Sequence, residues 1–286
     1  MPRAEASIAD PLVAGPSDAT AATAAARAIV GRPSRRRRSL ARALGGIIVA
    51  LAIWEAISLS GLVQAQALAG VGATAAALAT HAGQLAAAVT ASLEAWAIGL
   101  GIAAVLGITV GALVGRLWIA EAFTEVLVRM MRPLPSLALI PIAILIAGLG
   151  LKMTAGLVAF TSFWPIFINT RYGVQQVDNL FVDTGRALGL RRVTLMVRVF
   201  IPAAAPLIAS GLQIAISLAL VVTVSVELVS GSGGLGTFVM QAQQGNAVPT
   251  MYAGILVGGF VGWILNSGFT LFTRRLVPWS NRLEHP

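Results

Sequence analysis

Six long apolar tracts constrain the fold of this chain more than any other feature of its sequence. They lie at about residues 43–62, 92–114, 134–149, 154–168, 207–228 and 252–272. A helix needs about 20 apolar residues to cross the roughly 30 Å of a bilayer core, so the tracts predict six transmembrane helices. The third and fourth tracts are short, and residues 148–152 between them are expected to turn a hairpin. With 57% hydrophobic and 11% charged residues, the expected fold class is all-α, a polytopic membrane helix bundle.

The basic residues predict the orientation of the bundle. All of the 20 lysines and arginines except Lys152 fall in the amino-terminal segment through Arg42 or in segments 116–132, 171–198 and 274–282. The alternating connections, 63–90 and 229–251, carry none. Because basic connections stay in the cytoplasm, both termini are expected there, in an even number of spans across the cell inner membrane.

Residues 1–38 differ in composition from the rest of the chain. They are rich in Ala, Pro, Ser and Arg and end in four consecutive arginines, so we predict a disordered basic cytoplasmic tail before a transmembrane domain at 39–286. The alternative is a cleaved secretory signal that ends at the Ala-Gln-Ala of residues 65–67. The apolar run between the four arginines and this tripeptide is long for a signal and contains Glu55, which favours a retained helix.

Several kinds of chemistry are not expected of this chain. There is no cysteine, which excludes disulfides and thiolate sites, and the single lysine, Lys152, does not belong to a phosphate-binding Gly-Lys-Ser/Thr loop. We therefore expect no enzyme, no bound cofactor and no ATP-hydrolysing site. The two histidines, His81 and His285, lie far apart, so no metal centre is expected. The basic residues are scattered between apolar tracts, so nucleic acid is not an expected partner.

Residues 231–236 fit the pattern G-x-G-x-x-G of dinucleotide-binding loops. That pattern binds a dinucleotide only between a strand and a helix, whereas here it follows an apolar tract. We predict a flexible or tightly turned outer connection instead.

The segment 169–206 is the most informative part of the sequence. Asp183 near a helix start, a left-handed Gly189 and a helix break at Pro202 predict a helix–turn–helix elbow. Arginines give the segment a polar side, and an apolar side comes from Leu188, Val193, Leu195 and Met196. An amphipathic linker lying on anionic lipid headgroups is the alternative.

The spacing of this segment resembles the EAA loop of the permease subunits of bacterial ABC importers. That loop reads Glu-Ala-Ala, three residues, Gly, nine residues, Ile-x-Leu-Pro. The matching positions are Asp183, Thr184, Gly185, Gly189, Val199, Ile201 and Pro202. Only Gly189 and Pro202 are identical to the pattern.

The similarity extends over about residues 45–280 and is greatest to the branch that serves sulfonates, taurine and nitrate. That branch has a segment like Arg-Pro-Leu-Pro-Ser-Leu-Ala-Leu-Ile-Pro at 132–141, a glutamate like Glu227 before a Gly-Leu-Gly turn at 234–236, and an Arg-Arg pair like 274–275.

The resemblance implies the type I ABC importer permease fold and an ATP-driven import function. The elbow would be a coupling helix that docks on a separate ATPase subunit, with Ala187 and Leu188 packed into it, Gly189 allowing the bend and Pro202 directing the exit. The implied partners are a second permease copy, most simply in a homodimer, an ABC ATPase dimer that hydrolyses the ATP, and a solute-binding protein. A self-sufficient secondary transporter or channel is the alternative, but buried charge is scarce. A membrane-anchored enzyme or scaffold would need a catalytic module.

Three residues of the fifth tract are expected to line the translocation path: Glu227, Thr223 and Ser217. Structural hydrogen bonding is the alternative for each of them, since Ser and Thr in membrane helices often bond their own backbone. Glycines also recur every four residues, at 107, 111 and 115 and at 254, 258 and 262. Such rows allow close helix packing, which we expect within one subunit rather than between two.

Overall fold

The computed structural model describes residues 35–61, 64, 67–116, 126, 128–131 and 135–276. Residues 1–34 of the predicted tail and 132–134 of the branch motif lie outside the described residues. The chain divides into two units, Met1–Ser60 and Gly61–Pro286. The regular structure of the described residues is entirely helical, which confirms the predicted fold class.

The first unit contains one described helix, α2 (Arg35–Leu59). It covers the first apolar tract and begins with the four arginines, so the helix starts inside the segment predicted to be a disordered tail. Its apolar side chains, such as Ile47, Ile48 and Ile53, are exposed within this unit. An exposed apolar surface all along a helix is typical of a lipid-facing span.

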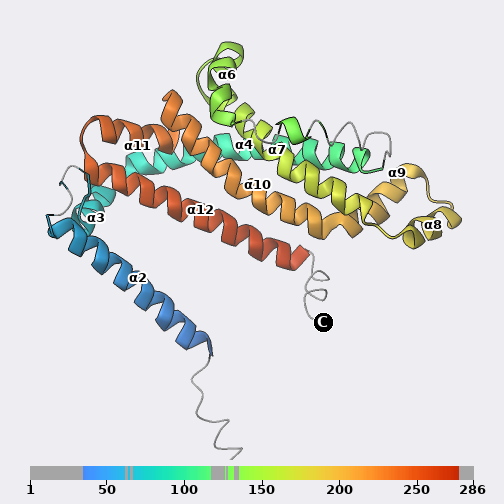
Figure 1. The fold of residues 1–286 in the computed structure, drawn as a ribbon, viewed down its shortest axis with the longest axis horizontal. Helices are drawn as coiled ribbons and strands as arrows, with labels where there is room; N and C mark the ends of the chain where they lie inside the picture. The colour runs from blue at the N-terminus through green and yellow to red at the C-terminus, as the bar shows by residue number, and fades with distance from the viewer. Residues whose placement is uncertain are drawn as a thin grey trace, which may run out of the picture. The chain divides into compact units, whose positions relative to one another are not determined.

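The second unit contains the remaining tracts (Figure 1). Its helices in chain order are α3 (Val71–Thr80), α4 (Ala82–Val114), the 3₁₀ helix η1 (Ser136–Leu139), α6 (Ile140–Ala147), α7 (Leu151–Gln175), α8 (Asn179–Ala187), α9 (Arg192–Leu195), the π-helix η2 (Met196–Phe200), α10 (Ile201–Ser230), α11 (Gly234–Gln244) and α12 (Val248–Leu276). In the described part of the chain, four helical stretches are long and apolar enough to cross a membrane: Ala82–Val114, Leu151–Gln175, Arg192–Ser230 and Val248–Thr273. Shorter apolar helices at Leu44–Leu59 and Ser136–Ala147 cover the first and third tracts.

The predicted hairpin between the third and fourth tracts is confirmed. α6 ends at Gly148, whose φ is 73°, and α7 begins after Gly150, whose φ is 122°. Both values favour glycine because they lie in a region that side chains with a Cβ rarely adopt.

Glycine rows hold the long helices together inside one subunit. α7 packs against both α4 and α10. A Cβ added at Gly107 would lie 2.9 Å from Ile166 of α7, and one at Gly111 would lie 2.8 Å from the Phe167 carbonyl oxygen. In α12, a Cβ at Gly254 would lie 2.7 Å from Val239 of α11. These close approaches confirm the prediction that both rows pack within the subunit.

Candidate functional site

The elbow, residues 178–202, begins with α8. The Asp178 side chain caps this helix by accepting a 2.9 Å hydrogen bond from the Leu180 N–H. Asp183 therefore lies inside α8, and the prediction that it marks the helix start is wrong. The predicted turn at Gly189 is confirmed, since its φ is 73° and its N–H bonds the Arg186 carbonyl at 2.9 Å.

The predicted helix break at Pro202 is also wrong. After the turn, α9, η2 and α10 run on as one helical stretch, Arg192–Ser230, with Pro202 in the first turn of α10. Proline has no N–H to donate to the Arg198 carbonyl, and in a regular α-helix its ring would clash there. The wider turns of the π segment Met196–Phe200 end directly before this position, so the helix accommodates the proline by changing its winding.

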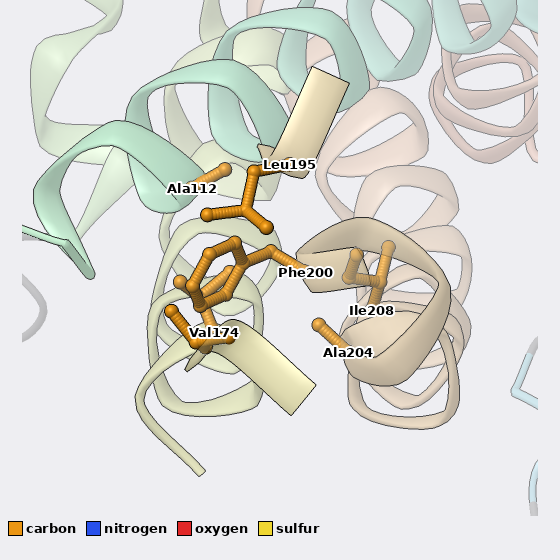
Figure 2. Close-up of a cluster of buried hydrophobic side chains, with 7 residues drawn as sticks. Ala112, Val174, Leu195, Phe200, Ala204 and Ile208 are labelled. Atoms are coloured by element: carbon orange, nitrogen blue, oxygen red, sulfur yellow. The ribbon is translucent and has the colours of Figure 1, made fainter. Parts of the chain in front are cut away.

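A buried apolar cluster fixes the elbow to the transmembrane helices (Figure 2). It consists of Ala112, Val174, Val182, Leu195, Phe200, Ala204 and Ile208, and the sequence-predicted Val199 and Ile201 pack against it. Gly185 packs closely against the same cluster, because a Cβ there would lie 2.5 Å from a methyl group of Leu195. The Arg116 guanidinium at the end of α4 lies 4.0 Å above the Phe200 ring. The elbow is thus packed against α4, α7 and α10.

The opposite side of the elbow exposes apolar side chains. Leu188 is 75% exposed and Phe181 is 61% exposed, and Leu180 and Val193 are exposed as well. Phe181, Thr184 and Leu188 border a groove of about 330 Å³ that Leu190 and Val199 also line. Asp183 pairs with Arg186 at 3.1 Å on the exposed surface. Of the other sequence-predicted residues, Ala187, Gly189 and Pro202 are exposed too.

A polar arrangement around Glu227 lies at the end of α10 that is far from the elbow. Glu227 is 2% exposed, and its carboxylate accepts a 2.7 Å hydrogen bond from the Ser92 hydroxyl of α4 and a 3.0 Å bond from the Gly236 N–H of α11. Ser92 in turn accepts a 2.8 Å bond from the Leu235 N–H. The carboxylate therefore caps the start of α11, where the free N–H groups and the helix dipole favour a negative charge.

The Gly-rich turn makes this arrangement sterically feasible. Gly231, Gly233 and Gly234 all have positive φ, and a Cβ at Gly236 would collide with the Val224 carbonyl oxygen. The tight turn predicted for 231–236 is confirmed, but it leads into α11, a helix that the sequence did not predict.

The three predicted path residues do not lie together. Thr223 is buried like Glu227, and its hydroxyl donates to its own helix at the Ala219 carbonyl, 2.8 Å away. Ser217 lies on an exposed face of α10. Sequence reasoning missed Ser92, which is separated from Glu227 by 135 residues. Among the described residues, no group of three or more His, Asp or Glu side chains is arranged to hold a metal ion.

Comparison with known proteins identifies the family. Residues 103–282 match the family described as binding-protein-dependent transport system inner membrane component. The chain belongs to this family. The match begins in the last third of α4, runs through α12 and includes the whole elbow, so the chain is a multi-pass permease subunit of an ABC importer. The alternative of a self-sufficient channel or secondary transporter does not fit this family, whose members work with a partner ATPase and a substrate-binding protein.

Relatives of this permease cover most of its length. The permease protein SsuC of Bacillus subtilis (strain 168), whose name refers to aliphatic sulfonates transport, is 30% identical over 265 residues, 91% of this chain and 95% of its own. The nitrate import permease protein NrtB of Leptolyngbya laminosa is 31% identical and covers 66% of this chain and 68% of its own. The bicarbonate transport system permease protein CmpB of Synechococcus elongatus is 34% identical and covers 67% of this chain and 66% of its own.

Solved structures confirm the fold. The MetNI methionine ABC transporter in an inward-facing conformation aligns with a TM-score of 0.57 and 18% identity over 67% of this chain and 97% of that chain. An amino acid ABC transporter aligns with a TM-score of 0.55 over 70% of this chain and 96% of that chain. The permease therefore has the type I ABC importer permease fold that the EAA-like spacing implied.

Proposed function

We propose that this permease imports a small polar or anionic solute such as a sulfonate, taurine or nitrate. The names of three relatives support this class, because aliphatic sulfonates, nitrate and bicarbonate are all small oxyanions. The chain would not hydrolyse ATP or bind a cofactor, since it lacks a phosphate-binding Gly-Lys-Ser/Thr loop. Its energy would come from ATP hydrolysed by the partner subunit.

The exposed apolar side of the elbow is the observation that carries the coupling role. Leu188 and Phe181 stand exposed on a segment whose other side is packed against three transmembrane helices. An apolar protrusion of this kind is favourable only when another surface covers it. Docked on an ATPase, Ala187, Leu188 and Thr184 would contact the partner, Gly189 would set the bend, and Val199, Ile201 and Pro202 would pass its movement to α10.

The assembly follows from the same proposal. The chain has one set of six apolar tracts, so a second copy would complete the path, most simply as a homodimer. An ABC ATPase dimer would sit on the elbow side, where the basic connections also predict the cytoplasm and both termini. A solute-binding protein would deliver the solute from the opposite side.

The path residues divide into two roles in this proposal. Ser217, exposed on α10, would face the path that two copies enclose. Glu227 and Thr223 would act from the interior, where the Glu227 carboxylate joins α10 to α4 and α11.

A pull-down with a matched control tests the coupling role. Tagged Leu188→Glu and Gln175→Glu variants are purified from native membranes in mild detergent, and the co-purified proteins are identified by mass spectrometry. Both residues are exposed, and both changes add one carboxylate, but only Leu188 belongs to the apolar side of the elbow. We expect an ABC ATPase with wild type and Gln175→Glu and its loss with Leu188→Glu. Equal recovery with both variants would contradict the coupling role.

A further inference from the structure

A cavity of about 270 Å³ lies against the middle of α7, away from both the elbow and Glu227. It is lined by Met131, Phe160, Thr161, Trp164, Pro165, Ile168, Asn169, Ile214 and Leu218. This volume is near the lower end of the ~300–1,000 Å³ typical of small-molecule sites. None of these lining residues is ionisable, although several carry polar groups.

Trp164 has a hydrogen-bond donor without a protein partner. Its indole Nε1 is buried and makes no hydrogen bond, whereas the corresponding atom of Trp96 donates to the Ile216 carbonyl at 3.2 Å. Buried donors are nearly always satisfied in folded proteins, so an unsatisfied one beside a cavity indicates a missing acceptor. The Trp164 ring packs edge-on against the stacked rings of Phe163 and Phe167, with ring centroids 5.1 Å and 6.4 Å away. The donor is therefore fixed before any ligand arrives.

One backbone hydrogen bond of α7 is missing at the same place, although the helix continues. Pro165 lies inside the helix and has no N–H to donate to the Thr161 carbonyl, and both residues line the cavity. The Asn169 amide reaches back to the Pro165 carbonyl at 2.8 Å and keeps a second N–H. In a membrane, irregular backbone is tolerated where it is buried in protein or lines a polar cavity. In secondary transporters, hydrophobic segments that glycine or proline interrupts often point to the solute site.

We propose that this cavity is a transient binding site for the transported solute, in which the Trp164 indole N–H and the Asn169 amide donate to the oxygens of a small oxyanion. The inference rests on the proposed function and adds a site to it. Neutral donors fit an oxyanion that must leave again, because conduction needs binding weak enough for release. A lipid chain offers no acceptor for these donors.

The absence of cysteine allows a direct test. A single thiol is introduced as Thr161→Cys, with Asn169→Cys as a second reporter if the first variant does not assemble. The vesicles contain the complete transporter and are treated with 2-sulfonatoethyl methanethiosulfonate, a small reagent that itself carries a sulfonate. Ile264→Cys on the exposed face of α12 is the control, because a thiol facing lipid stays protonated and unreactive.

We expect modification at Thr161→Cys but not at Ile264→Cys, and protection by whichever of methanesulfonate, taurine, nitrate or bicarbonate the vesicles take up. Trp164→Phe, added to Thr161→Cys, keeps an aromatic ring but removes the donor. It should raise the solute concentration that halves thiol modification roughly tenfold, as expected for one lost hydrogen bond to an anion. Trp263→Phe, on an exposed face of α12, should leave it unchanged.

The possible failures are distinguishable. If none of the four solutes is taken up with ATP, the proposed substrate class fails, and this inference fails with it. If a solute is taken up but the reporters are unreactive, or react without protection, the cavity is closed or holds only water and the site is overturned. Protection that Trp164→Phe does not weaken would overturn the role of the indole donor.

Discussion

The Ser92 hydroxyl donates a 2.7 Å hydrogen bond to the Glu227 carboxylate across 135 residues of sequence. This bond and the Gly236 N–H join three helices, α4, α10 and α11, at one buried carboxylate. Truncating either partner leaves a buried polar group unsatisfied, which costs about 1–3 kcal/mol or more for a charged group.

Ser92→Ala should therefore lower the thermal stability of the purified permease measurably. Its control is Thr109→Ala in the same helix, where the hydroxyl donates only to carbonyls of its own helix, those of Val105 at 2.6 Å and Leu106 at 3.2 Å. Thermal unfolding in detergent, followed by size-exclusion chromatography of the heated samples, compares the two. Equal midpoints for the two variants would show that the Glu227 contact contributes nothing.

Gly236→Ala should disrupt the junction of α10 and α11 more severely. The new methyl group would collide with the Val224 carbonyl oxygen and lie 2.7 Å from the Leu228 nitrogen. Overpacking against backbone typically costs about 1–3 kcal/mol because neither atom can rotate away. Gly259→Ala in α12 adds the same methyl group into open space and should leave the amount of folded protein recovered from membranes unchanged.

Two glycines of α4 should respond to alanine in opposite ways. Gly111→Ala would place a methyl group 2.8 Å from the Phe167 carbonyl oxygen and push α4 away from α7. Gly101→Ala meets no atom within 4 Å and replaces a poor helix former, so it should be neutral or stabilising by up to about 1 kcal/mol. Unfolding midpoints of the two variants measure the difference, and a loss of stability in both would contradict intrasubunit packing as the reason for the row.

Substitutions on the two sides of the elbow should have different effects: a change on the buried side should lower stability, and a change on the exposed side should weaken binding of the ATPase. Leu195→Ala removes a buried member of the cluster and should cost about 2–5 kcal/mol, which lowers the unfolding midpoint. Val193→Ala changes an exposed residue two positions away and should leave the midpoint unchanged but reduce the ATPase recovered in a pull-down. If Val193→Ala does not reduce the recovery of the ATPase, Val193 does not belong to the surface that docks on it.

The turn of the elbow was predictable because its signal is local. Gly189 turns where the sequence placed it, since its positive φ suits glycine. The helix start was misplaced from Asp178 to Asp183 because both residues are aspartates, which commonly cap helices, and the resemblance drew attention to the second. The break expected at Pro202 was wrong because the helix continues through the π segment Met196–Phe200 into α10, and a proline in the sequence does not indicate such a change of winding.

Features that depend on distant contacts were not predictable. α11 escaped prediction because it is short and carries three glutamines, which interrupt its apolar pattern. The contact of Glu227 with Ser92 joins two different apolar tracts, so spacing along the chain gives no sign of it. The cavity beside Trp164 likewise depends on how α7 meets α10. Tract length nevertheless predicted a helix at each of the six tracts, because crossing a bilayer imposes a length on each one, but it gave no sign of the short apolar helix α3.

Site-specific crosslinking at the elbow tests the central claim most directly. In this cysteine-free chain, Leu188→Cys provides a unique thiol on the exposed side of the elbow, and Gln243→Cys provides one on α11. Each variant is labelled with a thiol-specific photocrosslinker in native membranes, and the products are identified by mass spectrometry. The proposal predicts an ABC ATPase crosslinked to Leu188→Cys and none to Gln243→Cys. An ATPase that co-purifies with the permease yet crosslinks to neither thiol, or to both equally, would contradict docking at the elbow.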